Sequence, residues 1–107
     1  MIFRYFDTKD VDALADRMAG DMVRRVPPAS VGDQGRKAEA KQQRTHDVLL
    51  QQVHDFARRE TLNVYKKARL ANRFKWALLE AGYPKEFADR LTYELATAVS
   101  TATSGRE

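Results

Sequence analysis

Residues 37–81 read KAEAKQQRTHDVLLQQVHDFARRETLNVYKKARLANRFKWALLEA and contain neither glycine nor proline. When each residue is advanced by 100°, as in an α-helix, one arc of this segment collects most of the apolar side chains. The arc contains Leu49, Leu50, Val53, Phe56, Ala57, Val64, Ala68, Ala71, Phe74, Leu78 and Ala81. Because a turn would reset the phase of such a stripe, its continuity favours one long central helix over about residues 38–81.

The same segment also carries local signs of a break near residues 60–63. Thr61 and Asn63 are weak helix formers and good helix caps. Glu60 and Lys67 place charges inside the apolar arc, and helices of this length are uncommon. Two helices joined by a turn at 60–63 are therefore the alternative to the long helix.

Two further helices are predicted on either side of this segment. The first covers about residues 9–26, where apolar residues recur at helical spacing until Pro27 and Pro28 end the helix. The second begins near Pro84, after Gly82 has ended the preceding helix, and extends to about Thr103. No segment alternates apolar and polar residues as a strand does. We therefore expect an all-α fold, a bundle of three to four helices.

We expect residues 1–107 to form a single helical domain, because domains commonly contain about 100–150 residues. Residues 27–44 have Val31 as their only large apolar residue, which predicts a mobile loop followed by an exposed helix start. Residues 104–107 are expected to form a frayed tail.

The composition excludes several classes of protein. The chain has no cysteine, which excludes disulfide scaffolds, thiol catalysis and cysteine-bound metals. No apolar run reaches the ~18–20 residues that cross a bilayer, so we expect no membrane partner and a cytoplasmic location. His46 and His54 would lie about 12 Å apart along a helix, too far to ligate one metal. With no catalytic motif either, we expect a protein that is not an enzyme and uses no cofactor or metal.

Positive charge is concentrated in residues 58–75. The formal net charge of the chain is +4, from 19 basic and 15 acidic residues. Residues 58–75 contain seven basic residues and one acidic residue, Glu60, and such a cluster produces a local positive potential. The candidate binding residues are six of these bases and two neighbouring aromatic residues: Arg58, Arg59, Lys66, Arg69, Arg73, Lys75, Tyr65 and Trp76.

On a helix, Lys66, Arg69 and Arg73 lie along one exposed strip, with Tyr65 and Trp76 at its edges. Bases interleaved with aromatic side chains suit contact with nucleic-acid phosphates and stacking on bases. Two structural interpretations compete with a binding role. The strip is a solvated face whose aliphatic stems cover the core, or it pairs internally with acidic residues of the first helix. Those acidic residues are Asp10, Asp12, Asp16 and Asp21.

We expect a small, non-enzymatic helical interaction or adaptor protein, whose basic strip binds an acidic protein partner or serves self-association. The alternative is a nucleic-acid-binding protein that contacts phosphate through the same residues. A helix over about 41–81 would be roughly 60 Å long, and the two shorter helices would leave part of its apolar stripe uncovered. That favours a homodimer, in which Glu60 and Lys67 meet across the dimer axis.

One turn has a local similarity to a known fold. Residues 78–84, LLEAGYP, followed by Phe87, Ala88 and Leu91, resemble the loop of ubiquitin-associated-type three-helix domains. The similarity covers about 14 of 107 residues, and the rest of the chain departs from that small fold. A glycine cap followed by an aromatic residue and a proline is common for structural reasons, so we assign no function from it.

Overall fold

The computed structural model describes residues 7–60 and 62–104, and side chains within these ranges up to residue 100. Its elements are α2 (Lys9–Arg25), a short 3-10 helix η1 (Pro28–Ser30), α3 (Arg36–Arg59), α4 (Val64–Ala81) and α5 (Lys85–Ser104). The all-α bundle is confirmed, with four α-helices and no strand in the described ranges. Of the predicted tail, Ser104 is the last residue of α5, and 105–107 lie outside the described residues.

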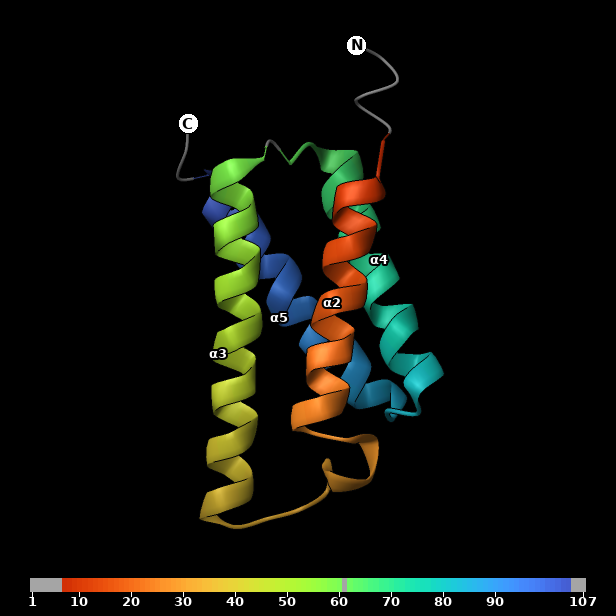
Figure 1. Ribbon diagram of the computed structural model, residues 1–107, viewed down its shortest axis with the longest axis vertical. Coiled ribbons are helices and arrows are strands. Elements are labelled where there is room, and N and C mark those ends of the chain that lie inside the picture. The colour runs from red at the N-terminus through yellow and green to blue at the C-terminus, as the bar shows by residue number, and fades with distance from the viewer. Residues whose placement is uncertain (1–6, 61, 105–107) are drawn as a thin grey trace.

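The four helices form a ring in which each packs mainly against two neighbours. α2 contacts α3 and α4, and α5 contacts the same two helices from the other side. Figure 1 shows α2 and α4 running in one direction and α3 and α5 in the opposite direction. α2 and α4 are therefore parallel neighbours, although the whole of α3 separates them in the chain.

Each helix buries one apolar stripe in a shared core, because its apolar residues recur every three to four positions. The largest fully buried apolar side chains are Phe74, Leu14, Met18, Leu49, Leu78, Val11 and Val53. Burial of a side chain of this size contributes about 1.5–3 kcal/mol to folding. The described helices lack the combination of length and apolar character that crossing a membrane requires.

The predicted long helix over about 38–81 is wrong, because α3 ends at Arg59 and α4 begins at Val64, as the alternative of two helices proposed. Glu60 has an extended backbone, and the Asn63 side chain accepts a 2.8 Å hydrogen bond from the Lys66 amide, which caps α4. Leu62 is only 6% exposed and belongs to the core. The buried leucine and the cap together fix where α3 ends and α4 begins.

The continuity of the apolar stripe in the sequence was misleading. The buried residues of α4 are Leu70, Phe74 and Leu78. Val64, by contrast, is 76% exposed, and Ala68 is exposed as well. Alanine favours a helix on any of its faces, so the alanines of the predicted arc carry no information about which face is buried.

The other helix ends agree with the predictions. α2 ends at Arg25, just before the two prolines, and α3 starts with an exposed first turn at Arg36. Gly82 ends α4 with a φ of 105°, in the left-handed region that favours glycine. The hydroxyl of Tyr83 donates a 2.6 Å hydrogen bond to the carbonyl oxygen of Val26, which ties the α4–α5 turn to the end of α2.

Candidate interaction surface

Most of the predicted strip lies on the side of α4 that faces α2. Its members recur every three to four positions, which places them on one side of a helix. We call Tyr65, Lys66, Arg69, Arg73 and Trp76 the α4 strip. Its two aromatic side chains are both exposed, Tyr65 at 43% and Trp76 at 55%. These five of the eight predicted residues therefore lie on one side of α4.

Asp12 and Asp16 of α2 lie opposite the arginines of the α4 strip. Arg69 donates through Nε and Nη2 to the two carboxylate oxygens of Asp12, at 2.9 and 3.2 Å. Arg73 donates in the same way to Asp16, at 3.0 and 2.9 Å. Bidentate pairs of this kind are stronger and more directional than single contacts. The hypothesis of internal pairing with the first helix is confirmed for these two aspartates.

The pairs also change the acidity of their members. The hydrogen bond from Arg69 holds the pKa of Asp12 below its ordinary value of 3.8, against the opposing effect of partial burial. The same bond raises the pKa of Arg69, and the bond to Asp16 raises the pKa of Arg73. Asp12 and Arg69 are therefore both charged at neutral pH. Each aspartate offsets one positive charge of the strip.

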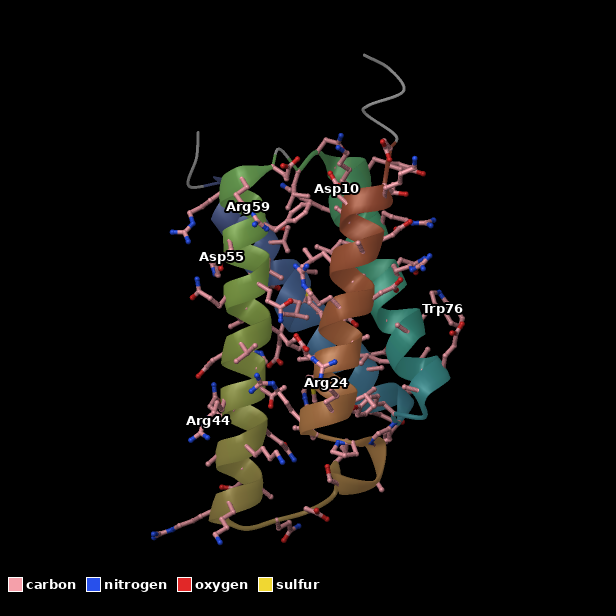
Figure 2. The ribbon with its side chains drawn as sticks, viewed as in Figure 1. Asp10, Arg24, Arg44, Asp55, Arg59 and Trp76 are labelled. Atoms are coloured by element: carbon pink, nitrogen blue, oxygen red, sulfur yellow. The ribbon has the colours of Figure 1, made fainter. Side chains whose placement is uncertain are left out.

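The remaining predicted bases lie on other surfaces. Arg58, in the last turn of α3, pairs with Asp55 at 2.6 Å. Lys75 pairs with Asp89 of α5 at 3.0 Å, on the opposite flank of α4 from the strip. Figure 2 shows Arg59 on α3 and Trp76 on α4, on opposite sides of the bundle. The eight candidate residues are thus divided among three surfaces, and the α4 strip is the largest group.

A hollow of about 360 Å³ lies along the α4 strip. It is lined by Asp16, Arg69, Asn72, Arg73, Trp76, Ala77 and Glu80. A guanidinium has five N–H donors, and each bidentate pair uses two of them, so three donors of each arginine are left for other acceptors. The hollow therefore offers an aromatic surface, N–H donors held in fixed positions, and carboxylates.

A second groove, of about 250 Å³, lies between α3 and α5. Nε2 of His46 is 3.3 Å from a carboxylate oxygen of Glu94 in this groove, and Arg90 lines it as well. His54 is exposed elsewhere on α3, so the two histidines do not meet. Within the described residues, no three histidine, aspartate or glutamate side chains are grouped so that they could hold a metal ion.

A further group of cations lies outside the predicted residues. Lys37, Lys41 and Arg44 of α3, together with Arg25 at the end of α2, line a hollow of about 330 Å³. Counting charges by segment concealed this group, because residues 27–57 contain four bases and four acids. The spacing i, i+4, i+7 of the three α3 residues was the signal available in the sequence.

Comparisons of the chain with protein-family profiles, with curated proteins and with solved structures find no significant match. We therefore infer function from the side chains and their surroundings alone. Two surfaces stand out among the described residues: the α4 strip with its exposed tryptophan, and the cation-lined hollow between α2 and α3.

Proposed function

We propose that the chain is a small, non-enzymatic interaction protein that binds a partner protein through the α4 strip. The observation that carries the proposal is Trp76, which is 55% exposed at the edge of a hollow that also contains Arg69 and Arg73. Tryptophan, tyrosine and arginine dominate the energetics of protein–protein interfaces. The strip presents all three residue types within three turns of one helix.

The bidentate pairs favour this role because they hold the arginines in place before a partner arrives. A flexible arginine loses side-chain entropy when it binds, whereas Arg69 and Arg73 are already ordered by Asp12 and Asp16. Their unused N–H groups suit the carbonyl or carboxylate oxygens of a partner. Lys66 has no ion pair within the described residues and adds a positive charge. The partner that fits is a protein segment with acidic residues and a site for the indole ring.

The same surroundings favour a protein over a nucleic acid at this surface. A phosphate backbone that approached the strip would also meet the carboxylates of Asp16 and Glu80, which line the same hollow. Repulsion from these groups would act on a nucleic acid at every phosphate, whereas a protein segment can place its few acidic residues opposite the arginine N–H groups alone. The alternative of phosphate contact through residues 58–75 is weaker for that reason.

Self-association was expected because one long helix would leave part of its apolar stripe uncovered. That long helix is not formed. α3 ends at Arg59, and the four helices cover one another's apolar stripes. Among the described residues, no uncovered apolar stripe of a roughly 60 Å helix is left that would require a second copy. The proposed partner is therefore a different protein.

The experiment compares Trp76→Ala with Tyr93→Ala, which removes an aromatic side chain that is 74% exposed on α5. Partners captured by the wild-type chain are identified by mass spectrometry, purified and titrated by calorimetry against both variants. We expect Trp76→Ala to weaken binding at least tenfold, and Tyr93→Ala to leave the Kd unchanged, because an anchoring tryptophan contributes more than about 1.4 kcal/mol. Equal Kd values for the two variants, or no partner that distinguishes them, would refute the proposal.

A further inference from the structure

The hollow between α2 and α3 is surrounded by positive charge. Its lining consists of Arg25, Lys37, Ala40, Lys41, Arg44 and Thr45, so four of six residues are cations and none is an acid. We call Arg25, Lys37, Lys41 and Arg44 the α3 cation cluster; all four are exposed. The cluster lies apart from the α4 strip: Figure 2 shows Arg44 on the outer side of α3 and Trp76 on that of α4.

None of the four cations is paired within the described residues. Their side chains take part in no ion pair or hydrogen bond there, in contrast to Arg69 and Arg73. Asp33 lines an adjoining hollow together with Arg25 and Lys41 but makes no ion pair with either. The positive charge of the cluster is therefore available to an external anion.

The start of α3 also departs from the rule that helix ends follow. The N-terminus of a helix carries a partial positive charge, so acidic residues and capping side chains are favoured there and bases are disfavoured. α2 follows the rule, with Asp10 and Asp12 in its first turn. α3 begins with Arg36 and Lys37, its first turn contains one acidic residue, Glu39, and its cap residue, Gly35, offers no side chain.

Residues that lower stability, such as bases at a helix N-terminus, are concentrated at functional sites, because they are kept where binding requires them. An anion bound beside the first turns of α3 would offset the repulsion between these bases and the positive end of the helix, because both would attract the anion. The unpaired cations and the basic start of α3, which share Lys37, thus both point to an anionic ligand.

The chemistry of the lining identifies the class of anion. The hollow contains no aromatic or large apolar side chain, and the hydroxyl of Thr45 is already bonded to the carbonyl oxygen of Lys41 at 2.8 Å. A protein partner would need an apolar anchor, and single-stranded nucleic acid would need aromatic rings for stacking. Backbone phosphates of a duplex need only positive charge, which this surface supplies.

We propose that the α3 cation cluster binds the phosphate backbone of duplex nucleic acid without reading its sequence. Lys37, Lys41 and Arg44 follow one side of α3 over about 10 Å of helix axis, and Arg25 adds a fourth contact from α2. This binding is independent of the α4 strip, so each proposal can fail without the other.

The test measures the fluorescence anisotropy of a labelled 20-base-pair DNA duplex between 50 and 200 mM salt. Four phosphate contacts predict that log K falls with log salt at a slope of about −3.6, and a Kd in the range of about 10⁻⁴–10⁻⁶ M at physiological salt. Lys41→Gln with Arg44→Gln is expected to reduce the slope to about −1.8. The control, Lys9→Gln with Lys85→Gln, makes the same change in net charge on other surfaces and should keep the wild-type slope.

One substitution at Lys37 distinguishes a role in binding from a role in stabilising the fold. Lys37→Glu should weaken DNA binding and at the same time raise the urea midpoint of unfolding, because an acid suits the first turn of a helix. A duplex RNA of the same length should bind with a similar slope. The proposal is overturned if no binding is detected at 50 mM salt, if the control variant loses as much affinity as the cluster variant, or if only vesicles containing anionic lipid bind.

Discussion

Asn63→Ala is the sharpest test of the break between α3 and α4. The Asn63 side chain accepts a 2.8 Å hydrogen bond from the Lys66 amide, one of the backbone donors that the helix itself leaves unpaired. Loss of such a cap costs about 1 kcal/mol. In a continuous helix the same change would instead stabilise the protein by about 0.5 kcal/mol, because alanine is the better helix former. The two structures therefore predict opposite signs.

The assay is thermal unfolding followed by circular dichroism at 222 nm, with wild type, Asn63→Ala and Asn72→Ala measured side by side. Asn72 is exposed in the middle of α4, so its replacement should raise stability slightly. We expect Asn63→Ala to lower the melting temperature by about 4 °C, because a loss of about 1 kcal/mol in the free energy of unfolding corresponds to that shift for a chain of this size. If Asn63→Ala stabilised the protein as much as Asn72→Ala does, residues 60–63 would be helical and the break would be refuted.

Three further outcomes are expected. Burial raises the pKa of Tyr83 to about 12. Since the neutral phenol is favoured in the folded state, the contribution of Tyr83 to stability should be constant below about pH 10 and be lost between pH 10 and 12. Tyr83→Phe should remove that loss and should cost roughly 1–3 kcal/mol at pH 7, because the Val26 carbonyl is left without its hydrogen bond. The hydrogen bond with Arg69 lowers the pKa of Asp12, so the contribution of Asp12 to stability is present above pH 3.8, its ordinary pKa, and is lost as the pH falls below that value. Between pH 5 and 2, the urea midpoint of unfolding should therefore decline less steeply in Asp12→Asn than in wild type. Light scattering should give the monomer mass of 12.2 kDa at high micromolar concentration, and twice that mass would restore the homodimer.

The helix ends were predictable from the sequence where a single residue determines the local backbone conformation or its hydrogen bonding. Pro27 and Pro28 cannot donate hydrogen bonds, and Gly82 adopts a positive φ, so each marks an end without reference to the rest of the protein. The break at 60–63 was less visible because it depends on tertiary packing. Leu62 is buried by neighbours from other helices, and no local pattern shows that.

The binding surface was predictable only in part, because charge pairing depends on which helices meet. Helical spacing in the sequence places Arg69 and Arg73 on one strip. They pair with Asp12 and Asp16 because α2 lies beside α4 and parallel to it, which the sequence does not show. The α3 cation cluster was concealed for the same reason. Its acidic counterparts in the segment, such as Glu39, line a different groove in the folded chain.

The parallel pairing of α2 and α4 has a consequence for the order in which the protein assembles. Asp12 and Arg69, Asp16 and Arg73, and Val26 and Tyr83 are each separated by 57 residues. At a synthesis rate of about 5–20 residues per second, α4 follows α2 by about 3–11 s. Among the described helices, only α3 can cover the apolar face of α2 during that interval. α2 is therefore made before its main partner and is fully buried only when α4 has been made. Until then the nascent chain exposes part of this apolar face to other proteins.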